Sequence, residues 1–388
     1  MLRLIKTDKL DKIVDLLILV NFFVYSLSFF TVHLAIVSSF ELVGYVFVRA
    51  IKWTFIVSFI LLAYKVLRGE YNLKELALYI VIGILLIISY MKYKDGMIIL
   101  DVIYIALFKK ENYKKVLKVL LVTFIIGYVT ALLSMLFPSI IDASVMHMRY
   151  GALKKRFALG FKYVTFAPNF YLTLVILIIL LKEKFNVVTY VILFIINLIL
   201  FILTDTKNIF ICVLIVLILR YLFIDCKCEK IYCLFSKVSV IIFPLCAIFI
   251  FIISYIYDGK NEVLVFINKI LTGRLNLNHN AILNYGIKLF GQTVDISTNA
   301  ETYNYVDSSY ISILVLNGLI PFIIVLIFFT ALSYFAYKIN YKLLTISLFI
   351  IAIHSTFDPQ LIAIVFDPLI IIFYHSINSY NKSKLNTN

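Results

Sequence analysis

Arg274, His279 and Glu301 lie in the longest polar segment of the chain, residues 258–306, and Asp307 follows it directly. A guanidinium group binds anions and keeps its charge, whereas imidazole and carboxylate groups can exchange protons. In a chain that is otherwise apolar, a polar segment of this length is either a tether or the place where chemistry happens. We interpret this segment as the functional part of the protein and the apolar remainder as the scaffold that holds it.

A short amphipathic helix is predicted within this segment, just before Arg274. Apolar residues recur at helical spacing in the string NEVLVFINKIL, which begins at Asn261. A helix of this kind lies on a membrane surface with its apolar face in the lipid. It would hold Arg274 at the depth of the headgroups, where the phosphate of a lipid-linked ligand would lie.

A second polar segment, residues 138–166, is strongly basic and has Asp142 as its one acidic residue. An anionic ligand would balance this charge. The alternative is contact with anionic lipid headgroups or wall polymers. The basic residues are Arg149, Lys154, Lys155, Arg156 and Lys162.

Polar groups at the ends of two later apolar segments have alternative interpretations. Asp307 can cap the helix that follows it, can act in catalysis, or can do both. His354, in the string HSTFDPQ, is either an interface anchor or part of a site wall. Within the apolar segment that follows Asp307, Asn317-Gly318 and Pro321 predict a kink that opens a cavity.

Composition places the chain among membrane proteins, because it is 63% hydrophobic and only 15% charged over 388 residues. Apolar runs of about twenty residues predict membrane-spanning helices rather than barrel strands, which alternate. We predict an all-α polytopic bundle, residues 1–388 as a single integral membrane domain, with 138–166 and 258–306 as its long loops. About twelve spans are expected, at 14–37, 42–64, 75–91, 96–108, 116–137, 167–181, 187–204, 208–224, 238–257, 307–335, 341–356 and 361–377.

The distribution of positive charge predicts the orientation. Most Lys and Arg residues fall in segments that are cytoplasmic if both termini are cytoplasmic, as the positive-inside rule requires. Both long loops are then extracytoplasmic. The net charge of +15 does not indicate nucleic-acid binding, because no basic soluble domain carries it. The five cysteines suggest no disulfide framework, because they lie in or near spans or in one short loop predicted to be cytoplasmic.

Three pairs of short strings follow one another along the chain. They are Arg156-Phe-Ala-Leu-Gly160 with Pro168-Asn169, Gly273-Arg274 with Leu289-Phe290-Gly291, and Val306-Asp307-Ser-Ser-Tyr310 with Leu316-Asn-Gly318. Together with about a dozen spans and two large outer loops, they resemble the Wzy-type polysaccharide polymerases and the related O-antigen ligases. The resemblance covers most of the chain.

The resemblance implies a GT-C-like bundle in the bacterial cytoplasmic membrane and a glycosyltransferase of capsule, exopolysaccharide or O-antigen biosynthesis. Such an enzyme transfers a glycan from undecaprenyl diphosphate to a sugar hydroxyl of a second lipid-linked repeat unit. Membrane lipids, a flippase and a chain-length regulator are its implied partners. No Asp-x-Asp string is present, so we expect neither a metal nor a cofactor. The implied substrate-binding residues are Arg149, Arg156, Arg274 and Tyr310, and the base is one of His279, Glu301, Asp307 and His354.

Three other functions remain open from the sequence. A ligase or teichoic-type transferase would use the same scaffold with a different acceptor. A flippase for lipid-linked oligosaccharides would place more charges inside its spans and keep its loops short. A sensor or scaffold would usually carry a soluble output domain, and no such domain is evident in the sequence.

Overall fold

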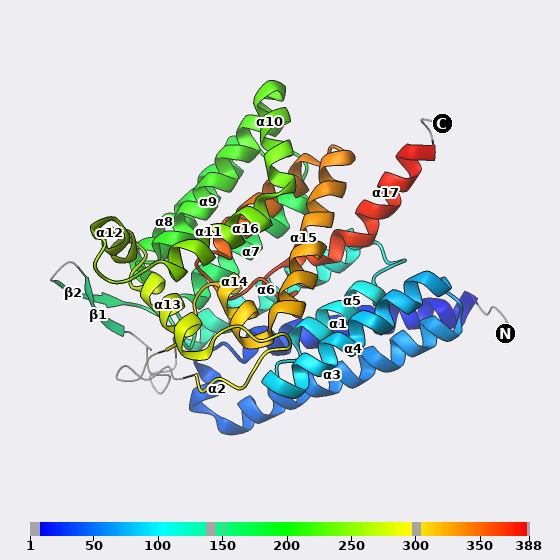
Figure 1. Cartoon of the computed structure of the whole chain (residues 1–388). Helices are drawn as coiled ribbons and strands as arrows, with labels where there is room; N and C mark the ends of the chain where they lie inside the picture. Colours follow the sequence, from blue (N-terminus) through cyan, green and yellow to red (C-terminus); the bar gives the residue numbers. More distant parts are fainter. Residues whose placement is uncertain (1–7, 137–144, 150–151, 297–303, 386–388) are drawn as a thin grey trace. The chain divides into compact units, whose positions relative to one another are not determined.

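The computed structural model describes residues 8–136, 145–149, 152–296 and 304–385, and there the chain is helical apart from one two-stranded hairpin (Figure 1). The predicted helical fold class is confirmed in this coarse form. The chain divides into two compact units. Met1–Tyr71, Ile103–Ile218 and Ile370–Tyr374 form the first, and Asn72–Val102, Leu219–Leu369 and His375–Asn388 form the second.

The first unit is built around helices α1 and α3, which pack side by side (Figure 1). Its core is rich in aromatic rings, such as Phe30 stacked on Phe170 with ring centroids 4.2 Å apart. Strands β1 and β2 pair antiparallel, with Val145 opposite Arg156. The elements are α1 (Asp8–Thr31), α2 (Ile36–Ser39), α3 (Glu41–Leu67), the second half of α5 (Met97–Leu107), α6 (Tyr113–Ser134), β1 (Val145–Arg149), β2 (Ala152–Arg156), α7 (Phe166–Leu181), α8 (Val187–Thr204) and nearly all of α9 (Lys207–Arg220).

The second unit contains the long polar segment and two π-helical turns, η1 and η2. A 3-10 turn, η3, and the last helix, α17, lie partly in this unit and partly in the first. The elements are α4 (Leu73–Tyr93), η1 (Tyr221–Asp225), α10 (Glu229–Val240), α11 (Ile242–Tyr255), α12 (Glu262–Ile270), α13 (Arg274–Tyr285), α14 (Ser309–Ser312), η2 (Ile313–Asn317), α15 (Leu319–Lys338), α16 (Lys342–His354), η3 (Pro368–Ile372) and α17 (Phe373–Leu385).

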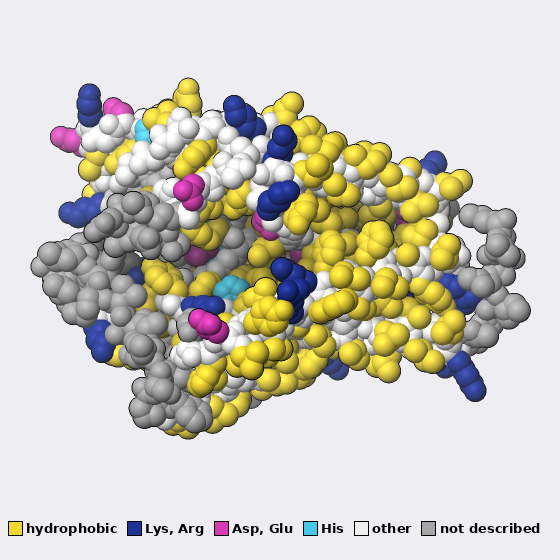
Figure 2. Space-filling model, turned by 90° about the horizontal axis from the view of Figure 1, so that it is seen from below, with side chains coloured by type: hydrophobic (Ala, Val, Ile, Leu, Met, Phe, Trp, Pro, Cys, Tyr) yellow, Lys and Arg dark blue, Asp and Glu magenta, His cyan; other side chains and the backbone are white. Residues whose placement is uncertain are grey.

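Several helices present apolar side chains on their outer surface. Leu42 and Trp53 of α3 are 75% and 64% exposed, and hydrophobic side chains cover much of the face seen in Figure 2. Water disfavours exposed apolar surface on this scale, whereas lipid tails accommodate it. The chain is therefore a multi-pass membrane protein. Seven helices of the described residues are long and apolar enough to cross a membrane, namely α1 from Lys9, α3, α4, α6, α8, α9 continued to Asp225, and α15.

The predicted count of twelve spans is not confirmed. Three predicted spans, 96–108, 167–181 and 341–356, are the short helices α5, α7 and α16. A fourth, 238–257, contains α11 and only the end of α10, and these two helices meet at an angle of 61°. Pro244 lies three residues into α11, and its ring disfavours a helical carbonyl at Val240, where α10 ends.

The predicted span 307–335 is not one continuous helix, and the predicted kink is a full break at Gly318. Pro321 prevents the Asn317 carbonyl from accepting a helical hydrogen bond. The Ser89 hydroxyl of α4 donates to that carbonyl instead, at 2.7 Å. Helix α15 begins anew at Leu319.

The last predicted span, 361–377, is also wrong as a continuous helix. Residues 357–367 form turns, and helix α17 begins only at Phe373. Pro359 and Pro368 cannot donate backbone hydrogen bonds, and each follows an aspartate with a buried side chain. Non-helical backbone of this kind is tolerated at membrane depth where the protein buries it.

The predicted amphipathic helix before Arg274 is confirmed as α12, which Asn261 caps through hydrogen bonds from the Val263 and Leu264 amides. After α13, the loop that contains Gly291 packs against the helix break at Gly318. The first free amides of α15, Leu319 and Ile320, donate to the carbonyls of residues 288 and 289 at 2.9 and 3.0 Å. This loop therefore caps α15 and ties the long polar segment to it.

Two glycines make the contact between this loop and α15 possible. Gly291 and Gly318 both have positive φ, 79° and 104°, and a Cβ on Gly318 would overlap the backbone nitrogen of Gly291. Gly318→Ala should lower the free energy of unfolding by about 3 kcal/mol or more, through backbone strain and displacement of the loop. Thermal unfolding in detergent measures this loss.

The matched control for Gly318→Ala is Gly83→Ala in α4. An added Cβ at Gly83 meets nothing within 4 Å, and its φ is helical. Alanine there should leave stability unchanged or raise it by roughly 0.5–1 kcal/mol. Equal unfolding temperatures for the two variants would show that the loop contact is not needed for stability.

Candidate functional site

Arg274 and Asp307 form an ion pair in the second unit. The Arg274 Nε lies 3.3 Å from Asp307 Oδ2, and both side chains are 19% exposed. Arg274 opens helix α13, where the helix dipole disfavours a cation, so the site needs a compensating anion. Asp307 supplies it from just before α14. Its carboxylate is not the N-cap of α14, a position that Ser308 occupies.

Burial raises the pKa of Asp307 to about 6, because removal from water disfavours the charged carboxylate. Arg274 opposes this shift, and the charge of Asp358 adds to it. A carboxyl group with a pKa near 6 is ionised at neutral pH and remains basic enough to accept a proton from a reacting group.

A second pair, His354 with Asp358, lies at the end of α16. The His354 Nε2 is 3.4 Å from Asp358 Oδ2, and both side chains are buried. Arg274 also interacts electrostatically with His354, as Asp307 does with Asp358. The structure thus brings together three predicted site residues, Arg274, Asp307 and His354. Asp358 belongs to the HSTFDPQ string, but the sequence reasoning did not name it as a site residue, although its i, i+4 spacing from His354 was a usable signal.

Ser309 ties α14 to the turn that contains Asp358. Its amide donates to the Ser355 carbonyl at 2.9 Å, and its hydroxyl donates to the Asp358 carbonyl. The Leu361 amide donates to the same hydroxyl at 3.1 Å. The adjacent Ser308 hydroxyl is buried and has no hydrogen-bond partner among the described residues. A polar ligand at the site could bond to it.

Tyr305 adds a hydrogen-bond donor near Asp307. Burial, together with the charge of Asp307, raises the pKa of Tyr305 to about 12. The phenol therefore keeps its proton at neutral pH. Asp95, between α4 and α5, also interacts electrostatically with Tyr305, and burial raises the pKa of Asp95. Sequence reasoning missed both residues, because neither belongs to a recognisable spacing pattern.

His279 and Tyr310 make contacts outside the Arg274–Asp307 pair. The His279 Nδ1 lies 2.9 Å from the Ser254 carbonyl, and its ring meets Tyr257 edge-on. Tyr310 is buried, and its hydroxyl donates to the Ala352 carbonyl at 2.9 Å. These contacts hold α13 against α11 and α14 against α16, which positions the two ion pairs.

The other predicted site residues lie elsewhere in the chain. Arg156 belongs to the first unit, is 7% exposed, and donates from Nε to the Thr204 carbonyl at 2.6 Å. Its Nη2 donates to the Thr206 hydroxyl at 3.4 Å. Arg149 closes strand β1, and its side chain lies outside the described part of the chain, as does the whole of Glu301.

Arg156→Ala should destabilise the protein, because it leaves the buried Thr204 carbonyl at the end of α8 without this donor. The expected loss is about 2–3 kcal/mol of unfolding free energy. Lys155→Ala, at an exposed neighbour, should change stability by less than about 0.5 kcal/mol. Thermal unfolding of both variants tests this. Wild-type stability of Arg156→Ala with weakened donor binding would instead assign Arg156 to the ligand.

Comparisons of the chain with protein-family models, with curated proteins and with solved structures return no match. The contacts described above are therefore the basis for a functional proposal. They combine a half-buried guanidinium, a carboxylate of raised pKa and a buried histidine–carboxylate pair.

Proposed function

We propose that the protein is a glycosyltransferase of the Wzy type, which polymerises lipid-linked oligosaccharide repeat units. In this proposal it crosses the bacterial cytoplasmic membrane about twelve times with both termini in the cytoplasm. The segments 138–166 and 258–306 face outward. The donor is an undecaprenyl diphosphate-linked glycan, and the acceptor is a sugar hydroxyl of another lipid-linked unit.

The Arg274–Asp307 ion pair is the observation that supports this proposal most strongly. A guanidinium suits a diphosphate because its planar fork bonds two oxygens at once. Asp307 is the counterion of Arg274 in the free protein. An incoming diphosphate would replace it and release the carboxylate for proton transfer.

The proposed step breaks the bond between the anomeric carbon of the donor glycan and the diphosphate oxygen. A new bond forms between that carbon and the acceptor oxygen. The acceptor proton passes to Asp307, and the electron pair of the broken bond leaves on the diphosphate. Arg274 stabilises the charge that develops there, a contribution that is large in a site shielded from water. The step requires no metal ion.

His354 and Asp358 are proposed to shape the electrostatics of this step. The charge of Asp358 raises the pKa of Asp307, and the His354 Nε2 lies 3.4 Å from Asp358 Oδ2. The pair also lies in the turn that Ser309 anchors. His354 remains a second candidate for the base, and the variants discussed below distinguish it from Asp307.

Measuring the lipid-linked intermediates that accumulate in the source organism tests the proposed function. Deletion of the gene should abolish long polysaccharide and cause single repeat units on undecaprenyl diphosphate to accumulate at the outer face of the membrane. Mass spectrometry of extracted lipids and gel analysis of the polymer measure both effects. Accumulation at the inner face would indicate a flippase, and normal chain lengths with failed attachment would indicate a ligase. Either result contradicts the proposal.

A further inference from the structure

Helix α3 carries two cations on its outer surface, Arg49 and Lys52, one turn apart. Both side chains are exposed, and neither has an ion pair or hydrogen bond to another described residue. The helix is 27 residues long, and only 17% of its most apolar window is buried in the protein. Charges inside a spanning helix almost always face the protein interior or a partner. These two therefore require a counterion that the described residues do not supply.

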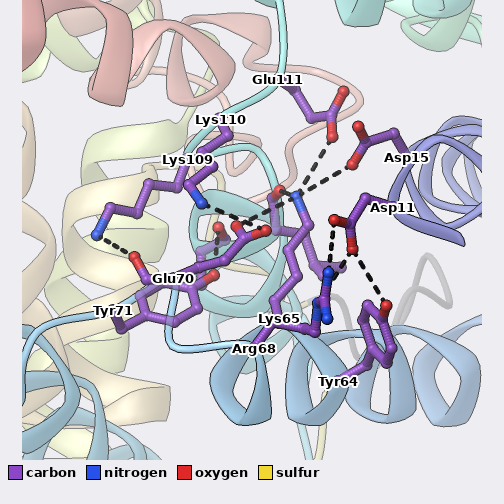
Figure 3. Close-up of polar contacts among 12 residues, drawn as sticks. Asp11, Asp15, Tyr64, Lys65, Arg68, Glu70, Tyr71, Lys109, Lys110 and Glu111 are labelled. Atoms are coloured by element: carbon purple, nitrogen blue, oxygen red, sulfur yellow. Dashed lines mark hydrogen bonds and ion pairs between the residues drawn. The ribbon is translucent and has the colours of Figure 1, made fainter. Parts of the chain in front are cut away.

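We place one edge of the membrane at the opposite end of α3, where charged side chains gather. There Lys65 approaches the carboxylates of Asp15, Glu70 and Glu111 at 3.7, 3.9 and 3.3 Å (Figure 3). Asp15 is 51% exposed, and the neighbouring Lys110 is 58% exposed, so this cluster meets water. Arg68 and Asp11 extend it at 2.7 Å.

Helix geometry then sets the depth of the two cations. Lys52 lies thirteen residues from Lys65, about 20 Å along the axis, and Arg49 lies about 24 Å away. The hydrocarbon core is about 30 Å thick. The backbone at both positions is therefore inside the hydrocarbon. The two side chains must extend along the helix toward the nearer interface for their charges to reach phosphate groups.

A shallow depression surrounds Arg49. It is lined by Tyr45, Val46, Arg49, Ala50 and Trp53, and the guanidinium carbon stands 5.0 Å from the centre of the Tyr45 ring. Tyr45 and Trp53 are 58% and 64% exposed. Tyr45 lies twenty residues from Lys65, about 30 Å along the axis, which is the level of the lipid headgroups, where tyrosine side chains sit with the polar atom toward water.

We infer that this surface, the α3 cation site of Tyr45, Arg49, Lys52 and Trp53, binds the headgroup of an anionic phospholipid. The two unpartnered cations complement the headgroup phosphate and its net negative charge. The exposed apolar residues that follow along α3, such as Ile56 and Ile60, then accompany the acyl chains. The inference is independent of the proposed enzymatic function.

Trp53 is the single tryptophan of the chain, so its fluorescence reports on this site alone. The protein is reconstituted in phosphatidylcholine vesicles that contain either brominated phosphatidylglycerol or brominated phosphatidylcholine at equal mole fraction. Bromine quenches tryptophan only at short range. Brominated phosphatidylglycerol should quench Trp53 more strongly than brominated phosphatidylcholine. The expected difference corresponds to a roughly tenfold higher affinity of the site for phosphatidylglycerol, because each cation near the headgroups favours anionic lipid.

The double variant Arg49→Gln with Lys52→Gln should remove this preference and leave the two lipids equally effective. The control is Lys115→Gln with Lys118→Gln on α6, which removes two exposed cations at the same spacing from a helix surface without such a depression. It should retain the preference. Equal quenching by both lipids in the wild type, or an unchanged preference in the Arg49 and Lys52 variant, would overturn the inference.

Discussion

Replacing Arg274 by alanine should abolish chain elongation while the protein stays in the membrane. The guanidinium is proposed to hold the departing diphosphate, and loss of an arginine that stabilises phosphoryl charge costs about 10³-fold or more in rate. Arg274→Lys should recover little activity, because an ammonium group cannot bond two phosphate oxygens in one plane. Polymer length on gels and the rate of repeat-unit consumption measure the effect.

The control for Arg274 is Lys269→Ala, an exposed cation at the end of α12 in the same polar segment. This variant should polymerise normally. Because Arg274→Ala leaves the Asp307 carboxylate without its ion pair, Arg274→Gln is tested beside it as a neutral side chain that can still donate a hydrogen bond. Long polymer from both neutral variants would exclude Arg274 from the diphosphate site.

Replacing Asp307 by asparagine should lower the turnover rate by about 10²- to 10⁴-fold, the usual contribution of a general base. The pH profile gives a sharper signature. A base must be ionised to act, and burial raises the pKa of Asp307 to about 6. Wild-type activity should therefore be constant above pH 7 and fall about tenfold per pH unit below pH 6.

Arg274 lowers the pKa of Asp307 through the ion pair, so its removal should move the acidic limb of the profile to higher pH. The residual activity of Asp307→Asn should lack that limb. His354→Gln separates the two candidate bases. If it removes the limb and Asp307→Asn retains it, the base is His354.

Much of the fold could be predicted from local sequence signals. The apolar spacing before Arg274 predicted α12, and long apolar runs predicted helices such as α3 and α8 within a few residues. Composition alone could not reveal breaks. The run at 361–377 is apolar on average, but Pro368 within it prevents a continuous helix. Whether a proline kinks a helix or ends it depends on neighbours such as the Ser89 hydroxyl.

The candidate site was predictable as a set of residue types but not as a set of contacts. Arg274 and Asp307 are separated by 33 positions, and no spacing rule pairs residues so far apart. Their ion pair forms because α13 and the segment before α14 come together in the folded chain. His279 had the chemistry of a base, yet its ring faces the Ser254 carbonyl on α11.

Binding of the isolated lipid carrier tests the central claim most directly. Native mass spectrometry of the detergent-solubilised protein can compare undecaprenyl diphosphate with undecaprenyl monophosphate, for the wild type and for Arg274→Gln. We predict that the wild type prefers the diphosphate by about tenfold or more and that the variant loses this preference. Equal binding of both lipids by the wild type, or an undiminished preference in Arg274→Gln, would contradict the account.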